Sequence, residues 1–143
     1  MSISLAFFVD GIPRPQGSLS AGISNSGRAY VYHSNSGMLP WRNTVTEMAY
    51  RAMDRREDDL HPLSGPVGLE AIFFMPRPKS RKDEYWHVTT PDLDKLLRAI
   101  CDALTYAGVV VDDKVIADIS TRKVYGERTG VQITVSTLDS AGE

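Results

Sequence analysis

Two pairs of aspartates flank one amphipathic segment, which runs from Pro91 to Asp113. Asp92 and Asp94 stand at its start, and Asp112 and Asp113 close it. Four carboxylates brought together repel one another strongly unless a cation neutralises them. Mg²⁺ prefers such oxygen ligands, with water and substrate phosphate completing its shell. The residues therefore predict a divalent-metal site built from both pairs.

Other interpretations of these aspartates explain less of the pattern. Asp92 could simply cap a helix, but capping accounts for one aspartate and not for four. The spacing does not fit the calcium loop of an EF-hand, which needs alternating oxygen ligands, a central glycine and a distal glutamate. One cysteine and three scattered histidines do not make a typical structural zinc site.

Several polar residues accompany the aspartates. Arg98 follows Asp94 by four residues and shares its helix face. It either forms an ion pair worth a few tenths of a kcal/mol or steadies charge on a phosphate. Lys95 could contact a neighbouring phosphate. Asp102, two turns beyond Asp94, either supports the site or is solvated, and His87 is expected on the surface.

A basic loop leads into the first aspartate pair. Its cations could neutralise phosphates, and its aromatic rings could stack on an unpaired base. A solvated loop without a ligand is the alternative, and Arg14, in the segment from Gly11 to Gly17, carries the same two interpretations. The residues of the basic loop are Arg77, Lys79, Arg81, Lys82, Tyr85 and Trp86.

Hydrophobic periodicity predicts the elements that hold these residues. Spacings of three and four predict a helix between the aspartate pairs, with Leu93, Leu96, Leu97, Ile100, Cys101 and Leu104 on its apolar face and Gly108 as its C-cap. A second helix is predicted from about Met38 to Asp54. Strands are predicted at 3–9, 29–33, 67–75, 115–124 and 131–137, with a short strand or turn at 109–111 and a loop at 18–27. This order predicts an α/β fold with a mixed sheet and two main helices.

Length and composition describe one ordinary domain. The 143 residues predict a single domain over 1–143, with a mobile loop at 16–28 and a frayed tail at 138–143. No apolar run approaches the roughly 20 residues of a membrane span, and no signal peptide is recognisable, so a cytoplasmic location is expected. A net charge of −2 is not typical of nucleic-acid-binding domains but does not exclude the class. The lone Cys101 is expected to be a buried small side chain.

The central segment, PDLDKLLRAICDALTYAGVVVDDKVI, resembles the signature of RusA-type Holliday-junction resolvases. That signature has Asp-x-Asp-Asn-Leu-x-Lys, then Asp-Ala-Leu, a glycine, and an Asp-Asp pair before an apolar residue. The segments GIPRPQGS and GRAYVYHS and the helix start at Trp41-Arg42 are also similar to longer members of the family. The resemblance covers most of the chain.

The resemblance implies a homodimeric endodeoxyribonuclease of a bacterial or phage-infected cell, acting in DNA recombination and repair. Such an enzyme binds four-way or other branched DNA and cuts two strands symmetrically, using Mg²⁺, for which Mn²⁺ can substitute. The essential aspartates of the family fall on Asp92, Asp94 and Asp113, with Asp112 beside them. The catalytic lysine of the family falls on Arg98, and Lys95 stands where the family usually has asparagine.

These two departures keep rival functions open. Arg98 retains the charge of a lysine but cannot give up a proton at ordinary pH. One alternative is a module that binds branched DNA in a metal-dependent way without cutting it. A second is a nuclease of the same fold that acts on other branched DNA, and a third is a metal-stabilised interaction protein with no DNA role.

Overall fold

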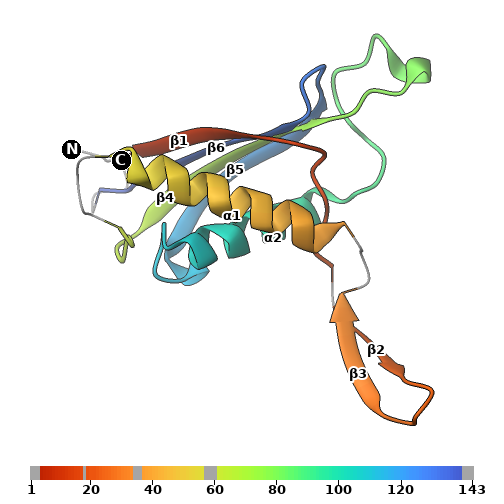
Figure 1. The fold of residues 1–143 in the computed structure, drawn as a ribbon. Coiled ribbons are helices and arrows are strands. Elements are labelled where there is room, and N and C mark those ends of the chain that lie inside the picture. Colours follow the sequence, from red (N-terminus) through yellow and green to blue (C-terminus); the bar gives the residue numbers. More distant parts are fainter. Residues whose placement is uncertain (1–3, 18, 34–36, 57–60, 140–143) are drawn as a thin grey trace.

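A computed structural model describes residues 4–17, 19–33, 37–56 and 61–139 of the chain (Figure 1). The elements, in chain order, are β1 (Ser4–Asp10), β2 (Leu19–Ile23), β3 (Ala29–His33), α1 (Met38–Asp54), β4 (Val67–Met75), η1 (Lys79–Arg81), α2 (Leu93–Ala107), η2 (Asp113–Val115), β5 (Ile116–Tyr125) and β6 (Gly130–Thr137). Both predicted helices are present, and residues 140–143 of the predicted frayed tail lie outside the described residues.

The main sheet is mixed and has the strand order β1-β6-β4-β5. Strand β6 pairs antiparallel with both β1 and β4, whereas β4 and β5 run parallel, with Leu69 opposite Ile119 and Phe73 opposite Lys123. Parallel neighbours need a crossover connection, and α2 provides it. The predicted α/β fold with a mixed sheet and two helices is therefore confirmed.

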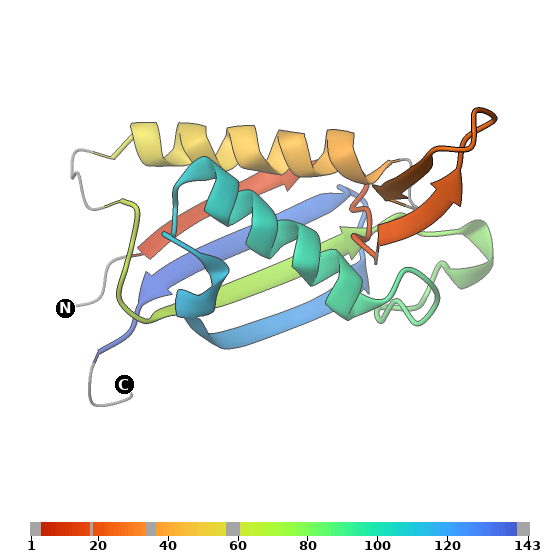
Figure 2. The ribbon, with the colours of Figure 1, turned by 90° about the horizontal axis from the view of Figure 1, so that it is seen from below.

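Helices α1 and α2 lie on the same face of this sheet (Figure 2). The alternating residues of β4 that face them are buried, and so are the apolar stripes of both helices. Burial of each large apolar side chain contributes on the order of 2 kcal/mol. The core therefore holds α2 firmly against the sheet. Its largest fully buried side chains include Phe73, Met38, Leu96, Ile100, Leu104 and Ile133.

A second, two-stranded sheet was not fully predicted. Residues 19–23 form β2, which pairs antiparallel with β3 in register Leu19 to His33. The prediction of a loop over 18–27 is wrong for this strand. Its Ser, Ala and Gly residues give no strand signal of their own, and the strand forms because β3 pairs with its backbone. Residues 109–111, for which a short strand or a turn was predicted, form no strand, and Val110 makes a single parallel bridge to Leu63.

Strand β5 occupies one edge of the main sheet (Figure 2). The predicted strand is present, but Ala117, Asp118, Ile119 and Ser120 are all exposed, so its alternating pattern does not bury Ala117 or Ile119. Helix α2 runs diagonally away from this strand toward the other side of the sheet. The start of β5 is therefore exposed.

Three of the described segments that carry polar sequence motifs gather at one end of the molecule. The β2–β3 hairpin, the loop after β4 and the start of α2 lie at the end opposite the chain termini (Figures 1 and 2). Among the described helices, none is long and apolar enough to cross a membrane.

Candidate active site

Local signals fix both ends of α2, the helix between the aspartate pairs. The helix starts after Asp92, whose backbone is extended (φ −69°, ψ 140°) and whose carbonyl accepts the Leu96 N–H at 3.1 Å. It ends at Gly108, which adopts the left-handed conformation (φ 83°) that glycine enters without a Cβ clash. The predicted C-cap is thus confirmed. Because the core fixes α2 between these ends, the residues that flank it have defined positions.

Asp92 occupies the N-cap position, yet its side chain makes no capping hydrogen bond. Its carboxylate instead lies 3.6 Å from the Lys95 ammonium, and both side chains are about half exposed. Capping is therefore not what this carboxylate does. The carboxylate faces solvent next to a cation, as a ligand or substrate contact would require.

Lys123, which the sequence analysis missed, holds the residues immediately before Asp92. Its ammonium donates to the Thr89 carbonyl at 2.5 Å and to the Pro91 carbonyl at 2.7 Å. Burial lowers the pKa of Lys123, and the charge of Asp92 acts in the opposite direction. Lys123 is on β5, so the end of that strand and the start of α2 are joined through this one side chain.

At the other end of α2, Asp112 and Asp113 crowd one another. The Asp112 carboxylate accepts the Lys114 N–H at 3.0 Å, and this bond lowers the pKa of Asp112. A hydrogen bond with Asp112, burial and the Asp112 charge together raise the pKa of Asp113, and the charge of Asp102 adds to the effect. Asp112 thus disfavours the ionised form of Asp113, and a cation beside the pair would offset this effect.

The two aspartate pairs do not meet within one chain. Asp92 is next to Lys123, near the end of β5, whereas Asp113 comes just before Ile116, at its beginning. Seven residues of strand between Ile116 and Lys123 span about 23 Å at about 3.3 Å per residue. Accordingly, no group of three or more potential metal-ligating side chains is found among the described residues.

Arg98 and Asp94 are both exposed on the outer side of α2. No salt bridge joins them, although both belong to the described part of the chain. The simple ion pair that their spacing allowed is therefore not formed. The Arg98 guanidinium therefore faces solvent one turn from Asp94.

Asp102 is part of a network that the sequence did not reveal. Its carboxylate accepts a hydrogen bond from the Gln16 side-chain Nε2 at 2.5 Å and lies 3.7 Å from the Arg42 guanidinium, which itself donates to the Gln16 side-chain Oε1 at 3.0 Å. The Gln16 backbone N–H also donates to the Lys95 carbonyl at 2.9 Å. The network joins the N-terminal loop and α1 to α2, so Asp102 has a structural role and is not simply solvated. Only the three-dimensional fold reveals this role, because Gln16 and Asp102 are 86 residues apart.

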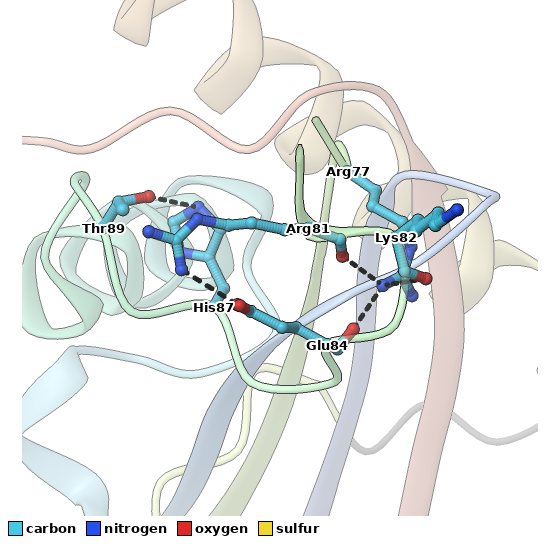
Figure 3. Close-up of polar contacts among 6 residues, drawn as sticks. All are labelled: Arg77, Arg81, Lys82, Glu84, His87 and Thr89. Carbon is cyan, nitrogen blue, oxygen red and sulfur yellow. Dashed lines mark hydrogen bonds and ion pairs between the residues drawn. The ribbon is translucent and has the colours of Figure 1, made fainter. Parts of the chain in front are cut away.

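His87 is buried, with 8% of its surface exposed, and the prediction of a surface histidine is wrong. Its backbone N–H donates to the Lys123 carbonyl, and its ring packs edge-on against Tyr125 at 5.1 Å. Burial, and then the charges of Lys123 and Arg81, lower its pKa. The ring nitrogen Nε2 contacts the Thr89 hydroxyl at 3.3 Å, and the contact is drawn in Figure 3. His87 is buried because residues 85–87 attach to the edge of β5, a contact that the local sequence could not indicate.

The basic loop is organised by its own arginines (Figure 3). The Arg77 guanidinium donates to the carbonyls of Arg81 and Lys82 at 3.0 and 3.2 Å, and also to the Glu84 carbonyl. Arg81 pairs with the Glu84 carboxylate at 2.9 Å. Arg77 and Arg81 therefore shape the loop, and the side chains exposed on it include Lys79, Lys82, Tyr85 and Trp86.

A pocket of about 490 Å³ opens at the start of α2. Asp92 and Lys95 line one part of it, and Arg14 and His87 line others, between walls that include four prolines. Arg14 thus shares this pocket with Asp92 of the first aspartate pair and with Lys95, a cation that could bind a phosphate. The arrangement joins a carboxylate to positive charge in a concave surface.

The donor chemistry fits Mg²⁺, since exposed carboxylates stand at both ends of α2 and those of one pair disfavour joint ionisation. The residues that would hold the ion are Asp92 and Asp94 at one end and Asp112 and Asp113 at the other. Each pair alone supplies two carboxylates, and water and a phosphate ordinarily complete the shell.

Comparison with known proteins gives one family match. The family described as endodeoxyribonuclease RusA matches residues 13–136, which is most of the chain and includes both aspartate pairs, Arg98 and the basic loop. No curated protein sequence matches the chain.

Proposed function

The chain belongs to the RusA endodeoxyribonuclease family, and from that membership we propose that it resolves four-way DNA junctions by Mg²⁺-dependent phosphodiester hydrolysis. Family membership indicates a hydrolase that cuts DNA internally. The observation that carries the finer proposal is the pair of solvent-facing carboxylates at each core-anchored end of α2. Recombination and repair are the processes in which such junctions arise.

The residues of the chain have separate tasks in this proposal. A cation would be held by Asp92 and Asp94 at one end of α2, or by Asp112 and Asp113 at the other, and when bound it would supply positive charge to the phosphate and acidify water for attack. Arg98 faces the phosphate and stabilises the negative charge that develops during displacement. Because its guanidinium stays protonated at ordinary pH, Arg98 acts by charge and does not donate the proton to the leaving oxygen.

Binding of the junction arms falls to the cations around the start of α2. Lys95 and Arg14 border the pocket at Asp92, and Lys79 and Lys82 are exposed on the basic loop. Arg77 and Arg81 contribute by shaping that loop. Each phosphate contact made by such side chains adds to the salt dependence of binding.

A cleavage assay on a mobile four-way junction with Mg²⁺ tests the proposal, with a flap and a linear duplex as competing substrates. The expected result is paired, symmetric nicks in the junction only, lost in Asp94→Asn and supported less well by Ca²⁺. Nicks in flaps at equal rate would assign a broader branched-DNA nuclease. Tight binding of the junction without any nick at pH 7 to 9 would refute cleavage.

Arg98→Lys separates charge from geometry at the family's lysine position. We expect cleavage within about tenfold of the wild type, because both side chains carry the positive charge, and a loss of at least a hundredfold in Arg98→Met. If Arg98→Met cleaves as fast as the wild type, the guanidinium has no part in the reaction.

A further inference from the structure

The β2–β3 hairpin projects from the rest of the molecule at the end that holds the start of α2 (Figures 1 and 2). Among the described elements, each of its two strands packs closely only against the other. A two-stranded hairpin on its own is marginally stable at best in water. The hairpin therefore has surface available for a partner, and contact with that partner supplies packing that the domain does not.

The turn at the far end of the hairpin has a fixed conformation. The Ser24 N–H donates to the Arg28 carbonyl at 2.8 Å, and the Arg28 N–H donates to the Ser24 hydroxyl at 3.1 Å. Gly27 closes the turn in the left-handed region (φ 84°), and its N–H donates to the Ser24 carbonyl at 2.9 Å. Arg28 is exposed, and no ion pair joins its guanidinium to another described side chain. The turn thus presents a cation at the tip.

The charge of the surrounding segment is of one sign. No carboxylate side chain occurs from Gly11 to Thr46, although the chain has 18 acidic residues. Of the arginines in this segment, Arg42 contacts the Gln16 network and Arg14 borders the pocket at the start of α2. Arg28 is the remaining one. An exposed arm that lacks carboxylates and ends in a guanidinium is complementary to a polyanion such as the DNA backbone.

Both ends of the hairpin are attached to the core beside the pocket. On one side Gln16, 7% exposed, donates its backbone N–H to the Lys95 carbonyl at 2.9 Å. On the other side α1 begins at Met38, which is fully buried. The two sides meet where the Arg14 side chain packs against Gly37, since a Cβ at Gly37 would lie 3.0 Å from Arg14 Nε. The base of the hairpin is therefore fixed next to the pocket that Arg14 and Lys95 line.

We propose that the β2–β3 hairpin binds the sugar–phosphate backbone of a duplex arm next to the cleavage site, with Arg28 on a phosphate. The proposal rests on the proposed function and names a second contact surface for the same substrate. Strands of five residues span about 17 Å at about 3.3 Å per residue. Successive phosphates of one strand are about 3.4 Å apart along the duplex axis. The tip therefore reaches phosphates about five nucleotides beyond those at its base.

A hydroxyl-radical footprint on a four-way junction tests this reach. The protein carries Asp94→Asn, which is expected to leave the DNA uncut. Backbone protection should extend about five nucleotides beyond the positions next to the cleavage site. Replacement of residues 19–33 by a Gly-Ser segment of equal length should remove the outer protection and keep the inner one. Outer protection that persists in the replaced protein would overturn the inference.

The salt dependence of junction binding tests Arg28 itself, with a surface substitution that leaves the fold intact. Loss of one phosphate contact should reduce the slope of log K against log salt by about 0.9. Arg28→Ala should therefore bind about fivefold to tenfold more weakly than the parent protein at 0.1 M salt and nearly equally at 1 M salt. The matched control is Arg55→Ala, an exposed arginine at the end of α1 near the chain termini, which should change neither quantity. Equal effects of both substitutions, or an unchanged slope in Arg28→Ala, would refute the contact.

Failure of this inference is distinguishable from failure of the proposed function. If the wild type cuts no DNA while the footprint and the salt slope change as expected, the proposed function fails and the hairpin contact stands. If the wild type resolves junctions while neither measurement responds to the hairpin variants, the hairpin has no DNA contact and the proposed function stands.

Discussion

Replacement of Lys123 by methionine perturbs the start of α2 with little loss of packing. Methionine keeps the apolar stem, and the change deletes the donor that holds the Thr89 and Pro91 carbonyls at 2.5 and 2.7 Å. Hydrogen bonds to charged groups contribute about 1.5–3 kcal/mol each. Water can reach the exposed Thr89 carbonyl after the change, and the partly buried ammonium no longer has to be desolvated. We therefore expect the free energy of unfolding to fall by about 2–3 kcal/mol in total.

Urea unfolding measures this loss. For a slope of roughly 2 kcal/mol per molar, the midpoint should fall by roughly 1–1.5 M. Lys79→Met, at an exposed lysine of the basic loop, should change the free energy of unfolding by less than about 0.5 kcal/mol. Under conditions in which both proteins are folded, Lys123→Met should cleave the junction at least tenfold more slowly than the wild type, because Asp92 is no longer held in position. A Lys123→Met protein with the wild-type midpoint and rate would refute a positioning role for this lysine.

Three further predictions concern the core and two titratable groups. Leu104→Ala should lower the free energy of unfolding by about 2–5 kcal/mol in urea titrations, because it opens a cavity under α2; a loss under 1 kcal/mol would contradict this burial. Burial raises the pKa of Cys101 to about 11, so its thiol should react with a disulfide reagent at pH 8 far more slowly in the native protein than in urea. Burial lowers the pKa of His87 below 6.5, so the unfolded state binds more protons as the pH falls from 6.5; stability should decrease over that window, and His87→Gln should flatten the decrease.

The parts of the fold that the sequence predicted are those with strong local periodicity. Helix α2 combines a continuous apolar stripe with a glycine that stops it, and both act within a few residues of chain. The buried alternation of β4 and β6 is equally local, since every second residue faces the core. These elements therefore needed no knowledge of their neighbours.

The parts that were missed depend on partners far along the chain. Strand β2 exists because β3 pairs with it, and its own residues carry no strand signal. His87 is buried because residues 85–87 attach to the edge of β5. Lys123 reads as a solvent-facing residue of an alternating strand, and its contacts with Thr89 and Pro91 bridge more than 30 residues. Sequence periodicity gives no information on such contacts.

The candidate site shows the same limit in its clearest form. The order of the motif suggested that both aspartate pairs act together, and a helix between them seemed to bring them close. A rigid helix does the opposite: 15 residues at about 1.5 Å each keep its ends about 22 Å apart. Both pairs can contribute to one centre only if another element reverses the separation.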